Sequence, residues 1–129
     1  IIKCESGFDE HAHSHAGAVG LMQIMPETFQ WLQTYTPGSK LDENKLSDPK
    51  INIMYGTLLI SILRKKYNND ETVLSSYNAG DSVVKRWLSD KTVSTDGEKL
   101  DNIPYKETKN YVDRVKNAIW IYKKLYFEL

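Results

Sequence analysis

The chain has 129 residues, of which 40% are hydrophobic and 26% are charged, a balance typical of one globular domain with a buried core. Seventeen Lys and Arg residues oppose seventeen Asp and Glu residues, so the net charge of zero provides no field that would attract nucleic acid or an anionic membrane. No apolar run reaches the roughly 20 residues of a membrane span, and the single cysteine, Cys4, excludes an intrachain disulfide. We therefore expect one domain over residues 1–129 with a polar, uncharged partner.

The chain begins with an apolar stretch, IIKCESGF, that has helical spacing. Ile1, Ile2, Glu5 and Phe8 fall on one side of such a helix, and Gly7 loosens it, so Glu5 is predicted near a helix end. No capping residue precedes this helix, and no signal pattern opens the chain. We therefore expect this segment to be a fragment of a longer chain, with any export signal outside it.

Two helices are predicted in the middle of the first half. After a loop rich in Gly, Ala and His, Pro26 begins a short helix that stops before Pro37 and Gly38. Residues 39–47 form a polar connection, and the pair Asp48–Pro49 then caps and begins a long helix. The apolar stripe predicted for the long helix is Ile53, Leu58 or Leu59, Ile62 and Leu63.

Three further helices are predicted in the second half. Asp70 caps one that ends at Gly80, and Asp81 or Ser82 caps the next, which precedes a polar, turn-rich stretch over residues 89–103. A long helix follows Pro104, with a predicted buried stripe of Tyr111, Val115, Ala118, Ile119, Tyr122 and Leu125. Because no alternating strand pattern and no repeat occurs, the predicted class is all-α.

Glu5 is the candidate for chemistry in the first helix. A carboxyl beside apolar residues and facing a cleft is partly desolvated, which favours its protonated form, as a general acid at neutral pH requires. The alternative is a solvated glutamate on a helix surface. The residue alone does not separate the two interpretations.

Several motifs extend this interpretation to most of the chain. The order is ESGF, AHSHAGAVGLMQIMPETF, DPKINIMYGTLLISIL, SSYNAG with SVVKRW, and IPYKETKNYVDRV. This order, from Glu5 to about Val115, resembles the lytic transglycosylase domain of the soluble (SLT) type, and the combination of GLMQIMP with YNAG is specific. The sequence departs from the family pattern at Ser75 and Ser76, where alanines are usual, and at His13.

The resemblance implies a lysozyme-like helical fold with a substrate groove that acts on peptidoglycan. The implied reaction cleaves the bond between N-acetylmuramic acid and N-acetylglucosamine and leaves a 1,6-anhydro end, with Glu5 as the single acid and base and without cofactor. Two alternatives stay open: a goose-lysozyme-like hydrolase of the same bond, and a catalytically silent glycan-binding module. The implied location is outside the cytoplasm at the cell wall, where the chain can belong to a larger assembly.

The same resemblance implies a set of substrate-binding residues. For Ser14 the alternative role is loop capping, for Met25 it is core packing, and YNAG taken alone is a helix C-cap. In the family, the glutamate matched by Glu107 faces the cleft and the tyrosine matched by Tyr111 closes it. The full implied set is Ser14, Gln23, Met25, Tyr77, Asn78, Glu107 and Tyr111.

Two polar clusters contain residue types that can bind metals. His11, His13 and His15 lie in a Gly/Ala loop and lack the spacing of strong metal motifs. The acidic residues between positions 42 and 48 lack the glycine and terminal glutamate of a calcium loop. No metal is predicted.

Overall fold

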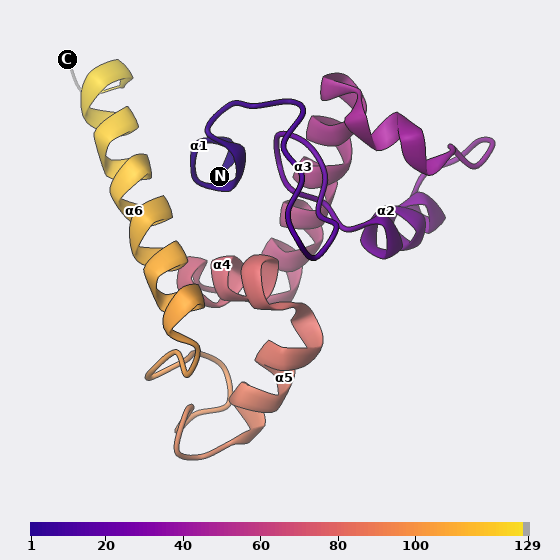
Figure 1. Ribbon diagram of the computed structural model, residues 1–129. Helices are drawn as coiled ribbons and strands as arrows, with labels where there is room; N and C mark the ends of the chain where they lie inside the picture. The colour runs from indigo at the N-terminus through magenta and orange to yellow at the C-terminus, as the bar shows by residue number, and fades with distance from the viewer. Residues whose placement is uncertain (128–129) are drawn as a thin grey trace. The chain divides into compact units, whose positions relative to one another are not determined.

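The computed structural model describes residues 1–127, which form helices joined by loops (Figure 1). Within these residues the only extended pairings are two isolated β-bridges, His13 with Val19 and Val19 with Ile24. The all-α class predicted from the sequence is confirmed. The chain divides into two compact units, Ile1–Leu59 and Ile60–Leu129, and the single domain expected over residues 1–129 stays a prediction.

The first unit begins with α1 (Ile2–Ser6) and a long loop that leads to α2 (Pro26–Leu32). Proline suits the first helical position because the first N–H of a helix has no intrahelical acceptor, so α2 begins where predicted. The short 3₁₀ helix η1 (Gln33–Tyr35) extends it. The helix α2 packs on the start of α3 through Phe29 and Tyr55, whose rings meet edge to face at 4.9 Å.

The polar connection before α3 is more ordered than the sequence predicted. It contains a second 3₁₀ helix, η2 (Glu43–Ser47), which Asp42 caps by accepting a hydrogen bond from the backbone N–H of Asn44 at 3.0 Å. Asp48 then caps α3 (Pro49–Lys66) as predicted, because its carboxylate accepts from the N–H of Lys50 at 2.8 Å.

The buried face of α3 is not the one predicted at its start. Ile53, a member of the predicted apolar stripe, is 38% exposed, whereas Asn52, Tyr55 and Gly56 are buried. The face is shifted by one residue because the polar Asn52 is anchored in the core by its own hydrogen bonds. The most deeply buried side chains of the first unit are Ile24, Phe29, Leu32, Leu46 and Asn52.

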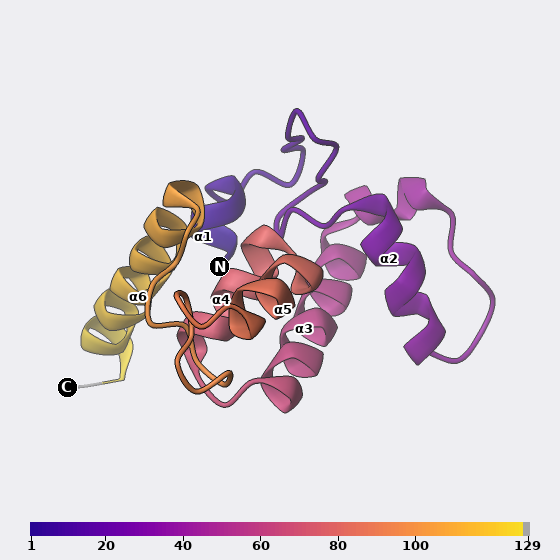
Figure 2. The same cartoon turned by 90° about the horizontal axis from the view of Figure 1, so that it is seen from below.

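In the second unit α4 (Asp70–Ala79) packs against both α5 (Asp81–Ser89) and α6 (Lys106–Tyr126) (Figure 2). The helix α4 ends at Gly80, whose φ of +97° is open to glycine and strained for other residues. The core between these helices consists of Val73, Leu74, Val84, Trp87, Tyr111, Val112 and Val115.

Both caps predicted in the second unit are wrong. Asn69 caps α4, because its side chain accepts from the N–H and the hydroxyl of Thr72 at 2.9 and 2.8 Å, and Asp70 lies inside the helix. The residue before α5 is Gly80, and the carboxylate of Asp81 instead accepts hydrogen bonds from α4 and from the end of α3.

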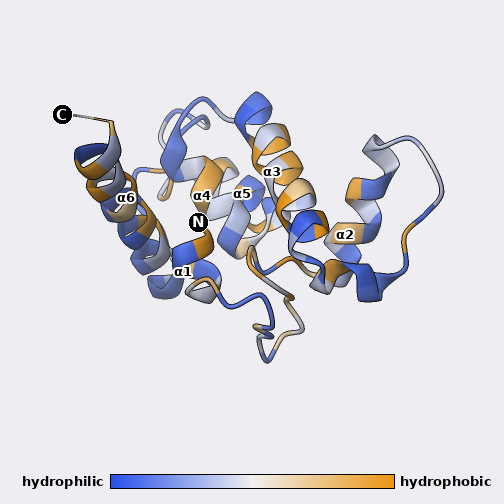
Figure 3. Ribbon diagram, turned by 90° about the horizontal axis from the view of Figure 1, so that it is seen from above, coloured by the Kyte–Doolittle hydropathy of each residue, from blue (hydrophilic) through white to orange (hydrophobic). Residues whose placement is uncertain are grey.

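The last helix buries its apolar face only as far as Ala118. Tyr111, Val115 and Ala118 are buried as predicted, but Ile119, Tyr122 and Leu125 are exposed, so the predicted stripe continues too far. Figure 3 shows hydrophilic and hydrophobic residues on different sides of α6. The helical period remains, but within the described residues the last turns of α6 bury no side chain. In residues 1–127, no helix is both long and apolar enough to traverse a bilayer.

Candidate active site

Glu5 lies in the last turn of α1 and is partly buried. The helix ends at Gly7, which adopts a left-handed conformation (φ +60°) and donates its N–H to the carbonyl of Lys3 at 3.1 Å. Phe8 follows with φ +69° and is 61% exposed. It therefore does not continue the helical face that carries Glu5, and that part of the sequence prediction is wrong.

Ser6 ties the turn that carries Glu5 to the GLMQ loop. Its hydroxyl oxygen lies 2.8 Å from the carbonyl of Leu21 and 3.1 Å from the carbonyl of Ile2, the first residue of its own helix. The shorter contact joins segments 15 residues apart. Ser6 is the second residue of the ES motif, and it is not among the site residues predicted from the sequence.

Gln23 has a structural role within the GLMQ loop. Its side-chain nitrogen donates to the carbonyls of Ala12 and Gly20 at 3.0 and 2.9 Å, and its backbone has a positive φ of +49°. Both amide hydrogens are therefore used inside the loop. The side-chain oxygen, an acceptor, is the atom left to meet a sugar hydroxyl.

The buried side chain of Asn52 fixes this loop to α3. Its oxygen accepts from the N–H of Met22 at 2.8 Å, and its nitrogen donates to the carbonyls of Val19 and Leu46 at 2.8 and 2.9 Å. The only sequence signal for this contact is an asparagine within an otherwise apolar helical run. The loop backbone lies so close to Asn52 that a Cβ on Gly20 would be 2.9 Å from the carboxamide carbon (Cγ) of Asn52.

Ser14 and Met25 are the other predicted contacts in the first unit. Ser14 is exposed, and its hydroxyl accepts from the N–H of Ala18 at 2.9 Å, the loop-capping role that the sequence left open. Met25 is partly buried and immediately precedes α2. Among residues 1–127, no three potential metal-ligating side chains gather at one place, and the three histidines are exposed.

Tyr77 and Asn78 lie in the last turn of α4, and both are partly buried. The side-chain oxygen of Asn78 accepts a hydrogen bond from the hydroxyl of Thr108 on α6 at 2.8 Å. Thr108, which follows Glu107 in the ET motif, is not among the site residues predicted from the sequence. This bond joins the two motifs of the second unit, YNAG and the ET element.

Behind YNAG, the carboxylate of Asp81 fixes the corner between α4 and α5. It accepts from the hydroxyls of Tyr67 at 2.6 Å and Ser76 at 3.1 Å, and it pairs with Lys66. Burial alone would raise the pKa of the Asp81 carboxyl, but the hydrogen bonds from Lys66, Tyr67 and Ser76 lower it below its ordinary value. Burial and the bond to Asp81 raise the pKa of Tyr67.

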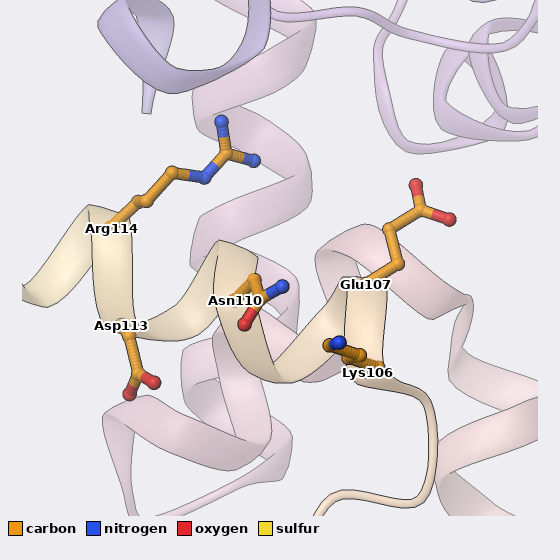
Figure 4. Close-up of a pocket in the computed structure, with 5 residues that line it drawn as sticks. All are labelled: Lys106, Glu107, Asn110, Asp113 and Arg114. Atoms are coloured by element: carbon orange, nitrogen blue, oxygen red, sulfur yellow. The ribbon is translucent and has the colours of Figure 1, made fainter.

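The residues predicted on α6 differ in their exposure. Glu107 is exposed and lines a shallow groove with Lys106, Asn110, Asp113 and Arg114; Figure 4 shows that Glu107 and Arg114 point to one side of the helix and Asp113 to the other. Tyr111 is only 1% exposed, so its burial favours a packing role in the core over a contact with substrate.

The structure therefore assembles two clusters of motif residues, one in each unit. In the first, Ser6 joins the turn of Glu5 to the GLMQ loop. In the second, the bond between Asn78 and Thr108 joins YNAG to the start of α6. The described chain is thus helical, with Glu5 on its short first helix and the YNAG and ET motifs at helix ends.

Comparison with known proteins places the chain in a family. The family model of the transglycosylase SLT domain matches residues 1–100, and the chain belongs to this family, as the motifs predicted. The soluble lytic murein transglycosylase of Escherichia coli K12 is 32% identical over 118 residues, which cover 89% of this chain and 18% of that protein.

Two solved structures share the fold. The lytic transglycosylase Slt of Pseudomonas aeruginosa, solved as an inactive glutamate-to-glutamine variant, is 30% identical with a TM-score of 0.79, over 96% of this chain and 20% of that one. The 70 kDa soluble lytic transglycosylase of E. coli is 28% identical with a TM-score of 0.80, over 97% and 21% of the two chains. The chain thus spans about a fifth of the length of these relatives.

Proposed function

We propose that this chain is the catalytic domain of a peptidoglycan lytic transglycosylase, with Glu5 as its acid and base. The observation that carries the proposal is the position of Glu5: a half-buried carboxyl on a short helix that Ser6 anchors to the GLMQ loop. Two relatives are lytic transglycosylases in their own right, and one of them is inactive when a glutamate is replaced by glutamine. A single essential glutamate fits the same role here.

The proposed reaction has two proton transfers through one carboxyl. Protonated Glu5 donates to the glycosidic oxygen, the bond from that oxygen to C1 of N-acetylmuramic acid breaks, and the acetamido carbonyl of that sugar stabilises the cation at C1. The Glu5 carboxylate then takes the proton of the C6 hydroxyl while O6 bonds to C1. The product is a 1,6-anhydro end, and Glu5 returns to its protonated form without a second carboxylate.

The remaining motif residues are proposed to hold the glycan strand. In the first unit, Ser14, Gln23 and Met25 offer a hydroxyl, an amide oxygen and a thioether. In the second unit, Tyr77 and Asn78 offer a phenol and a carboxamide, and Glu107 offers an exposed carboxylate. We assign Tyr111 to the support of α4 and α6, since it is buried.

The proposed setting follows from the substrate. Peptidoglycan lies outside the cytoplasm, so we place this domain at the cell wall, where it can act alone or within a larger assembly. The net charge of zero agrees with a neutral sugar chain as partner and with no nucleic-acid role.

Glu5→Gln tests the proposal. The change keeps the shape of the side chain but removes the transferable proton, so release of muropeptides from purified peptidoglycan should fall by about 10²–10⁴-fold with an unchanged melting temperature. Glu27→Gln is the matched control, because Glu27 is an exposed glutamate in the first turn of α2, and its activity should remain that of the wild type. Equal activity of the Glu5 variant and the wild type would exclude Glu5 as the acid. No release by the wild type would favour the glycan-binding module.

A further inference from the structure

Thr108 connects two elements of the second unit through one side-chain hydrogen bond. It lies in the first turn of α6 and is 1% exposed, and its hydroxyl donates to the side-chain oxygen of Asn78 at 2.8 Å. The bond spans 30 residues of sequence and lies where α4 packs against α6. A threonine in this position has a second option, which the structure does not use.

That second option would reverse the role of Asn78. A threonine hydroxyl inside a helix often donates to the carbonyl three or four residues earlier, and the carboxamide would then donate its N–H to the hydroxyl oxygen. In the described part of the chain, Thr57 makes such bonds to Ile53 and Met54, but Thr108 makes none to Tyr105, the residue that precedes α6. The hydroxyl hydrogen of Thr108 is therefore directed at Asn78, which must present its oxygen.

The orientation of Asn78 determines what it can offer a ligand. With its oxygen held by Thr108, the carboxamide turns its NH₂ group away from α6. Within residues 1–127 this nitrogen has no hydrogen-bond partner, and it is not among the buried side-chain atoms that lack one, so solvent or a ligand reaches it. Two N–H donors at that place match a carbonyl oxygen and would repel a cation.

We infer that Thr108 is a positioning residue, whose hydroxyl orients Asn78 as a hydrogen-bond donor to a carbonyl oxygen of the glycan substrate. Acetamido groups occur on both sugars of peptidoglycan and supply such a carbonyl. The inference rests on the proposed function, since it assigns a partner to a residue of the same site. Without the Thr108 hydroxyl the carboxamide presents oxygen and nitrogen alternately, and the oxygen repels the substrate carbonyl.

Thr108→Val tests this role, because valine has nearly the shape of threonine but no hydroxyl. The loss of one oriented hydrogen bond should lower kcat/KM for muropeptide release by about five- to tenfold. Thr108→Ser keeps the hydroxyl and should stay within about twofold of the wild type. In an Asn78→Ala background, Thr108→Val should cause no further loss, since the group that it orients is absent.

Thr72→Val is the matched control. Thr72 lies at the opposite end of α4, is fully buried, and donates its hydroxyl to the side-chain oxygen of Asn69 at 2.8 Å. It is thus also a buried threonine bonded to an asparagine carboxamide. Thr72→Val should lower the melting temperature as Thr108→Val does, but kcat/KM per folded molecule should not change.

Two results would overturn the inference. One is equal kcat/KM of the Thr108→Val variant and the wild type; the other is an equal loss in the Thr72→Val variant. The side-chain amide signals of Asn78 in nuclear magnetic resonance provide a readout without substrate: we expect them to move in Thr108→Val and to return in Thr108→Ser. If the wild type releases no muropeptides, the proposed function fails, and unmoved amide signals would then refute the orienting role separately.

Discussion

We predict that the buried side chain of Asn52 is essential for the stability of the GLMQ loop against α3. Asn52→Ala removes three buried hydrogen bonds at once, to the N–H of Met22 and to the carbonyls of Val19 and Leu46. The side chain is 1% exposed, so water does not replace it freely. The loop that precedes α2 loses its main polar connection to α3.

The expected loss of stability depends on whether each backbone partner of Asn52 keeps another hydrogen bond in the variant. The carbonyl of Val19 keeps its bond from the N–H of Ile24 at 3.1 Å, so it is not left without a donor. The N–H of Met22 is left buried without an acceptor, which costs about 1–3 kcal/mol, and the two lost bonds to carbonyls add about 1 kcal/mol each. We expect the free energy of unfolding to fall by about 3–5 kcal/mol.

Urea unfolding followed by far-ultraviolet circular dichroism measures this loss, and the melting temperature should fall by roughly 10–20 °C. Asn44→Ala is the control in the same unit, because Asn44 is exposed and its side chain lies outside the core. That variant should stay within about 0.5 kcal/mol of the wild type. A loss below about 1 kcal/mol for Asn52→Ala would refute the reasoning.

Two other substitutions test the packing around the same motifs. A glycine-to-alanine change inside a helix normally stabilises the protein by about 1 kcal/mol. In Gly56→Ala, however, the new Cβ would lie 2.7 Å from the methyl carbon of Met22, so we expect the free energy of unfolding in urea to fall by about 1–3 kcal/mol. A more stable variant would contradict the close contact. Asp81→Asn removes a carboxyl whose pKa is lowered in the folded state. In the wild type the ionised Asp81 carboxylate stabilises the fold above its ordinary pKa of 3.8, and this stabilisation is lost as the pH falls. The wild type should therefore lose more stability than the variant below about pH 4 in melting curves, and parallel curves would show that Asp81 does not contribute.

The sequence predicted the features that depend on neighbouring residues. Pro26 and the pair Asp48–Pro49 mark helix starts because each acts on the turn that it occupies, and Gly80 marks a helix end because of its positive φ. The predicted cap of α4, Asp70, is one residue after the observed cap, Asn69. Both residue types are good caps, and only the backbone conformation determines which one is used.

The contacts that shape the site could not be predicted in the same way. Ser6, Asn52 and Thr108 bond to partners 15, 30 and 30 residues away, and no local pattern encodes those partners. The exposure of the end of α6 could not be predicted because its apolar residues keep the helical period beyond the part that α4 covers. Leu125 therefore has the spacing of a core residue but is 62% exposed.

The central claim is that Glu5 directs the C6 hydroxyl of the sugar, and not water, onto C1. The most direct test is digestion of purified peptidoglycan by the wild-type protein in heavy-oxygen water, followed by mass spectrometry of the released muropeptides. We predict 1,6-anhydro ends that are one water lighter than hydrolytic ends and contain no heavy oxygen. Reducing ends that carry heavy oxygen would contradict the claim and identify the domain as a hydrolase of the goose-lysozyme type.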